Sequence, residues 1–322
     1  MVLSLFFIQN MIKQLSPLFN KTYTSLLSEQ TKHIFEKIIL TIAIASFFIH
    51  LIIIWLVDFG FISIQGAPLL FTNTISAIYT PFSFILVYEV YLLIYYLPKS
   101  ITTYISKQYE IISLIIIRRL FKDLSELTFS NNWFNIKYDL EFTYDLIASV
   151  LLFFLIYQFY VQNKKRYRTE DISASKAESI STFIKIKKII ATLLVPALFI
   201  AAIYSFLHWI MSVLSPSDIQ SISLKNINNI FFEQFFSMLI IADVILLLFS
   251  FFHTDEFHKV IRNSGFIIST ILIRLSFAAT GLLNTALIIS AVVFGLVILI
   301  IHNQFEKKLS LQENLNSHEY DA

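Results

Sequence analysis

The chain has 322 residues, of which 57% are hydrophobic and only 14% are charged, with a net charge of +2 and a mean hydropathy of +0.72. Soluble domains carry about a quarter charged residues, so this composition excludes an ordinary soluble protein. Because the chain has no cysteine, disulfides, iron–sulfur clusters and thiol catalysis are also excluded. Apolar runs of about eighteen residues predict helices that cross the roughly 30 Å hydrocarbon core of a bilayer. We therefore expect an all-α polytopic membrane protein.

Residues 1–36 are predicted to form a cytoplasmic or interfacial N-terminal segment. The apolar run 2–8 is short, has no basic residue before it and no small-residue cleavage site after it, so it does not fit a signal peptide. Apolar residues mixed with Lys13, Lys21 and Lys32 favour a helix lying on the membrane surface. A partly ordered tail explains the same pattern equally well.

Eight transmembrane helices are predicted from the apolar runs that follow. The predicted helices are 37–57, 72–97, 107–124, 142–162, 187–211, 230–252, 264–279 and 282–302. The connection between the fourth and fifth helices, residues 163–186, is predicted to be a basic cytoplasmic linker. Residues 303–322 are predicted to be a polar cytoplasmic tail.

The first and last four helices share sequence in the same order. Residues 111–121 (IISLIIIRRLF) and 267–277 (IISTILIRLSF) are identical at seven of eleven positions. Upstream, 89–95 (EVYLLIY) is matched by 243–249 (DVILLLF), and 37–41 (KIILT) by 188–192 (KIIAT). The offsets are 156, 154 and 151 residues, which indicates an internal duplication.

The duplication predicts two four-helix membrane repeats, 37–162 and 187–302. Each repeat contains an even number of crossings, so both must have the same orientation in the bilayer. They are therefore expected to be parallel repeats, related by an axis along the membrane normal.

The basic residues predict the orientation of the chain. With the N-terminus in the cytoplasm, 18 of the 24 lysines and arginines lie on the inner side, as the positive-inside rule requires. The other six are Arg118, Arg119, Lys122, Lys137, Lys225 and Arg274. We expect an integral protein of a bacterial inner (plasma) membrane with both termini cytoplasmic. Clustered charge at the start of the linker also predicts contact with anionic lipid headgroups through Lys164, Lys165, Arg166 and Arg168.

One acid and one arginine recur inside the predicted membrane region. Glu89 precedes Arg118 in the first repeat, and Asp243 precedes Arg274 in the second. A charge in the middle of a membrane helix costs about 2.5–3.5 kcal/mol, and pairing offsets this cost. Such a pair can fix the packing of two helices or lie on an ion or proton path. We place the secondary polar candidates for such a path at Arg119, Ser113, Ser269 and Thr270.

Other chemical motifs are absent. The sequence has no phosphate loop, dinucleotide fingerprint, catalytic triad or zinc motif, so we expect neither an enzyme nor a bound cofactor or metal. Nucleic acid is not an expected partner. The loop from His253 to His258 offers two imidazoles and two carboxylates, a set able to hold a cation, but we favour the interpretation as a solvated connection.

Two functions fit these patterns. The first is a channel- or transporter-like protein with a polar path near the acid–arginine pairs. The alternative is a structural or accessory subunit of a larger membrane complex, in which the pairs only join helices. A polar cavity reaching the acids would favour the first, and acids sealed by their arginines would favour the second.

Overall fold

The computed structural model describes residues 19–61, 77–126, 137–165, 174–214, 224–251, 256–277, 279 and 281–320. Within these ranges the chain is helical and contains no strand, which confirms the expected all-α architecture. A short helix at 19–26 precedes the long ones. The long helices are α2 (Glu29–Asp58), α3 (Tyr79–Tyr96), α4 (Ile101–Glu126), α5 (Lys137–Asn163), α6 (Ala174–Leu214), α7 (Leu224–Phe251), α8 (Phe257–Ser276) and α9 (Leu282–Tyr320).

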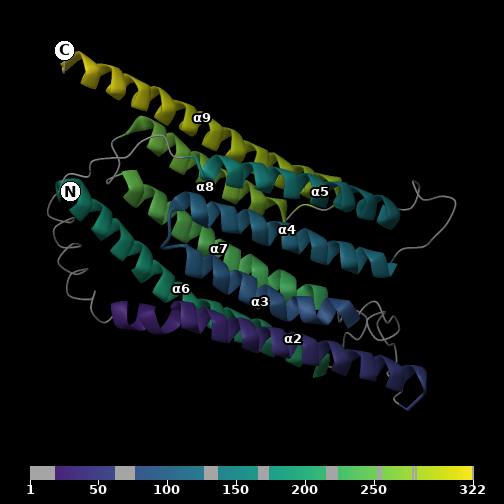
Figure 1. Ribbon diagram of the computed structural model, residues 1–322. Coiled ribbons are helices and arrows are strands. Elements are labelled where there is room, and N and C mark those ends of the chain that lie inside the picture. The colour runs from purple at the N-terminus through teal and green to yellow at the C-terminus, as the bar shows by residue number, and fades with distance from the viewer. Residues whose placement is uncertain are drawn as a thin grey trace.

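Successive helices alternate in direction along one bundle (Figure 1). The starts of α2, α4, α6 and α8 and the ends of α3, α5, α7 and α9 therefore lie at the same end of the bundle. We call this the basic end, because most of the lysines and arginines in the described ranges lie towards it, including Lys32, Lys99, Lys164 and Lys259.

Several of these helices have the length and apolarity of membrane helices. Four described segments are long and apolar enough to cross a bilayer: Glu29–Asp58, Asp139–Asn163, Ile180–Tyr204 and Leu282–Gln312. Two shorter apolar helices are Thr80–Tyr96 and Phe235–Phe251. The outer face of α2 exposes large apolar side chains, among them Ile34, Phe48 and Trp55. Such a face suits contact with lipid rather than water.

Helices α6 and α9 extend furthest beyond the predicted apolar stretches. Helix α6 begins at Ala174, within the predicted linker, and α9 continues through the predicted tail to Tyr320. Both extensions lack proline and glycine, so nothing in them breaks the helix. The predicted surface helix before residue 19 and the lipid-contact residues Arg166 and Arg168 lie outside the described residues.

Helices α4 and α8 are the central elements. In each half, consecutive helices pack against each other, and α5–α9, α3–α6 and α4–α8 contacts join the halves. At this junction the fully buried Tyr109 of α4 hydrogen-bonds Ser269 of α8, with 2.7 Å between the oxygens. A Cβ at Gly295 of α9 would overlap the Tyr109 hydroxyl, so glycine allows this close approach. The charged residues of α4 and α8 therefore lie on helices surrounded largely by protein.

Candidate functional site

The second half of the chain contains a buried ion pair. Asp243 lies on α7 eight residues before its end, and Arg274 lies on the neighbouring α8. Arginine Nη2 is 2.7 Å from Asp243 Oδ2, and the two residues are 7% and 0% exposed. A charge-assisted hydrogen bond of this length is strong in a water-excluded site. The structure thus brings together the two residues that the sequence paired in this half.

A third helix completes the surroundings of Asp243. The buried Tyr104 of α4 donates its hydroxyl hydrogen to Asp243 Oδ1 at 2.9 Å. Each carboxylate oxygen therefore has a hydrogen-bond donor, one from each half of the chain. The Asp243 site is sealed by its own partners and links the two halves.

The acid and the arginine singled out in the first half of the chain are arranged differently. Glu89 of α3 and Arg118 of α4 are both buried, at 7% and 8% exposure. The ion pairs closer than 4.0 Å in the described ranges do not include one between these two side chains. The charge of Arg118 acts on Glu89 through space, and Arg118 makes further contacts. The direct pair predicted for this half is therefore not formed.

Glu89 faces a cavity instead. A cavity of about 290 Å³ lies between α2, α3 and α4, with Glu89 in its wall. A water molecule occupies about 30 Å³, so the volume is ample for several waters. Four further charged residues line the cavity: Lys32, Glu36, Lys107 and Glu110. They belong to the parts of α2 and α4 nearest the basic end.

The remaining walls of the cavity are aromatic and aliphatic. Tyr88 and Tyr96 of α3 contribute hydroxyl-bearing rings, and Ile85, Leu92 and Ile111 contribute apolar surface. Lys107 and Glu110 form an ion pair at 2.8 Å across one turn of α4. The cavity is therefore charged towards the basic end of the bundle and amphipathic beside Glu89.

The secondary candidates Ser113, Ser269 and Thr270 do not line this cavity. The hydroxyls of Ser113 and Thr270 donate to carbonyl oxygens of their own helices, those of Glu110 and Ile267. Ser269 donates to the Ala291 carbonyl of α9 at 2.6 Å. All three are buried packing residues in this structure.

The fourth secondary candidate, Arg119, belongs to another buried network, towards the end of the bundle opposite the basic end. Its Nε and Nη2 donate to Asp145 of α5, and its Nη1 donates to Asn284 Oδ1 of α9 at 2.5 Å. Thr285 also donates to Asp145, at 2.8 Å. The sequence placed Asp145 near Arg119 but did not mark Asn284 or Thr285, because contacts between α4 and α9 are set by packing across the two halves.

No family model, curated protein or solved structure matches the chain significantly.

Proposed function

We propose that the chain is a channel- or transporter-like membrane protein whose polar path is entered through the cavity beside Glu89. The observation that supports this most is the cavity itself, which joins a carboxylate within an apolar helix to charged residues near the basic end. Glu89 lies seven residues before the end of α3, about 10 Å at 1.5 Å per residue. Acids at such depths commonly mark ion or proton pathways, where they face water-filled cavities rather than lipid.

We propose eight membrane crossings arranged as two parallel repeats, 37–162 and 187–302. Beyond the four long apolar segments, this needs α3, α4, α7 and α8 to cross as well. The polar side chains of α4 and α8 that are buried inside the bundle, such as Ser113 and Arg274, support this, because protein rather than lipid surrounds them. A membrane protein can carry charged residues on such protein-facing helix surfaces.

Two aromatic stacks support the duplication. Phe82 stacks on Phe121 with ring centroids 5.3 Å apart, and Phe236 stacks on Phe277 at 5.1 Å. The offsets from Phe82 to Phe236 and from Phe121 to Phe277 are 154 and 156 residues, the same as for the acids and the arginines. Equivalent positions on the second and third helices of each half thus make the same contact.

We propose that the basic end faces the cytoplasm of a bacterial cell, with the chain in the inner (plasma) membrane and both termini cytoplasmic. The supporting feature is the shared location of the lysines and arginines in the described ranges at that end. Lys164 and Lys165 are exposed just after α5, where they can contact anionic headgroups.

The sealed second site supports one alternative function. If Glu89 is also fully hydrogen-bonded by protein groups in the functional state, as Asp243 is, both acids serve only to join helices. The chain is then a structural or accessory subunit of a larger membrane complex, with its exposed apolar faces in contact with partners as well as lipid. The Asp243–Arg274–Tyr104 contacts are the observation that favours this alternative.

Ion flux in proteoliposomes tests the proposal. Purified full-length protein would be reconstituted beside Glu89→Gln and a control, Asp58→Asn, whose side chain is exposed at the far end of α2. We expect proton or potassium flux from the unaltered protein and from the control, and a clear loss in Glu89→Gln. Absence of flux from folded, inserted protein would contradict transport and favour the accessory subunit.

A further inference from the structure

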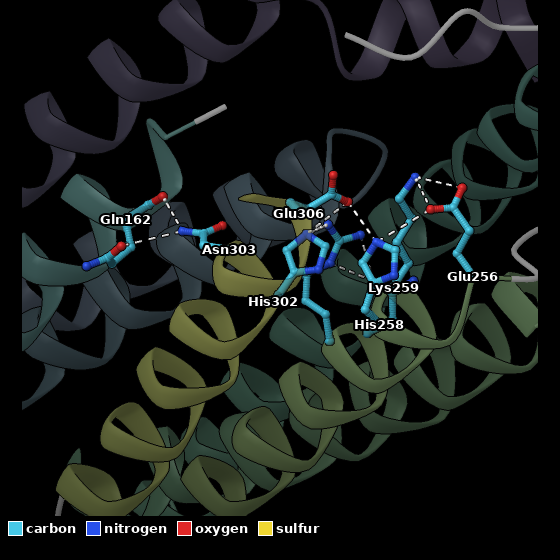
Figure 2. Close-up of polar contacts among 9 residues, drawn as sticks. Gln162, Glu256, His258, Lys259, His302, Asn303 and Glu306 are labelled. Carbon is cyan, nitrogen blue, oxygen red and sulfur yellow. Dashed lines mark hydrogen bonds and ion pairs between the residues drawn. The ribbon is translucent and has the colours of Figure 1, made fainter. Parts of the chain in front are cut away.

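Three potential metal ligands meet where α8 and α9 lie side by side at the basic end (Figure 2). His258 lies in the first turn of α8, while His302 and Glu306 lie one turn apart on α9. The i, i+4 spacing places the latter two on one helix face, towards α8. His302 and Glu306 come more than forty residues after His258 in the sequence. The nearer histidine, His253, lies outside the described residues.

The ligand atoms are close enough to share one ion. His258 Nε2 lies 2.8 Å from Glu306 Oε1, and His302 Nε2 lies 3.9 Å from the same oxygen. All three ligand atoms fall within 4.8 Å of one another. Around a tetrahedral zinc ion with bonds of about 2.0 Å, neighbouring ligand atoms are about 3.3 Å apart. Small side-chain adjustments therefore convert this cluster into a coordination site.

We propose that His258, His302 and Glu306 bind a divalent transition-metal ion of the zinc type and thereby bridge α8 and α9. Two imidazoles and one carboxylate are a ligand set that such ions accept, with a fourth position left for water or another ligand. The two histidines are buried, so the ion would be shielded on the protein side. This site is independent of the proposed transport path.

The helices already hold these side chains in place. Asn303, next to His302, donates to the Gln162 carbonyl of α5 at 2.9 Å and so fixes α9 beside α5 (Figure 2). The rings of His258 and His302 lie nearly parallel, with centroids 5.3 Å apart. Because these side chains are already ordered, metal binding would cost little conformational entropy, and the affinity for the ion would be higher.

Arg262 competes with the proposed ion. Its Nη1 lies 3.0 Å from His302 Nε2 and donates to that nitrogen, whose lone pair the metal would need. Arg262 also donates to Asn263 from Nε and Nη2, so it retains hydrogen bonds when the ion displaces it from His302. Lys259 is held at 3.1 Å by Glu256, the other carboxylate near His258. Removal of the Arg262 charge and donor should therefore strengthen metal binding.

Zinc titration of the full-length, chelator-treated protein in detergent tests this site. We expect saturable binding of one ion, measured by calorimetry and by metal analysis after dialysis. His258→Ala and Glu306→Gln should each weaken binding more than about tenfold, because even the loss of a residue that only hydrogen-bonds a ligand costs about 10–100-fold in metal affinity. His33→Ala, which alters an exposed histidine–glutamate pair, should leave that affinity unchanged. Circular dichroism and size-exclusion chromatography would establish that each variant is folded.

Arg262→Met, which removes both the charge and the donor, separates a metal site from a hydrogen-bonded cluster. If the ion binds as proposed, this variant binds zinc more tightly than the unaltered protein. Cobalt substituted for zinc should give a visible absorption band that is lost in His258→Ala. Absence of saturable binding by the unaltered protein would overturn the proposal, as would binding that persists in both ligand variants.

Discussion

The two acid–arginine sites occupy equivalent positions in the sequence but differ in their surroundings. Asp243 is fully buried, and both of its carboxylate oxygens accept hydrogen bonds, from Arg274 and Tyr104. Glu89 has no ion pair with Arg118 within 4.0 Å and lies in the wall of a charged cavity. The two sites thus differ in what surrounds the acid: protein donors around Asp243, and a charged cavity beside Glu89.

One position accounts for part of this difference. Tyr104 reaches from the third helix of the first half to the acid of the second half. The residue 156 positions later is Val260 on α8, which has no hydroxyl to donate. That position therefore offers no counterpart of the hydroxyl that Tyr104 donates to Asp243.

The largest expected effect is the loss of one partner from the sealed site. Arg274→Leu leaves the Asp243 charge buried and without its ion pair, which should lower the free energy of unfolding by about 3–5 kcal/mol. The combined variant Asp243→Asn with Arg274→Gln removes both charges and should be milder. Thermal and denaturant unfolding in detergent would measure both. Equal losses in the single and combined variants would exclude a direct ion pair.

Tyr104→Phe should have the next largest effect. It removes one hydrogen bond to a charged carboxylate, and such bonds contribute roughly 1.5–3 kcal/mol. The loss should shrink when Asp243 is already asparagine, because the two side chains interact directly. A double-mutant cycle on unfolding free energies would measure this coupling. Additive losses would mean that Tyr104 acts through packing alone.

Glu89→Gln should affect stability least. Because Glu89 makes no close ion pair with Arg118 and glutamine keeps its shape and hydrogen-bonding capacity beside the cavity, we expect a change of at most about 1 kcal/mol, the size of one ordinary hydrogen bond. The same variant should reduce ion flux, so its effect on activity would be large while its effect on the free energy of unfolding is small. A loss as large as that of Arg274→Leu would show that Glu89 is as tightly held as Asp243.

The all-α architecture could be predicted from the sequence because apolar runs recur along the chain and four of them are long enough to cross a bilayer as helices. The Asp243–Arg274 pair could be anticipated because both residues recur at matching offsets on consecutive helices. The partner Tyr104 could not, since it lies 139 residues before Asp243 and comes from the other half. The same limit applies to Asn284 beside Arg119 and to Glu306 beside His258. These contacts depend on how the halves pack, and a local pattern carries no signal for that packing.

Cysteine accessibility tests the difference between the two sites most directly. The chain has no cysteine, so single-cysteine variants carry only one reactive thiol. Ile111 lines the cavity, and Ile267 is its equivalent in the second half, similarly buried but outside that cavity. With a small charged methanethiosulfonate reagent, we predict that Ile111→Cys reacts in the folded protein and that Ile267→Cys is protected until unfolding. Equal protection of both thiols would contradict a water-accessible path to Glu89.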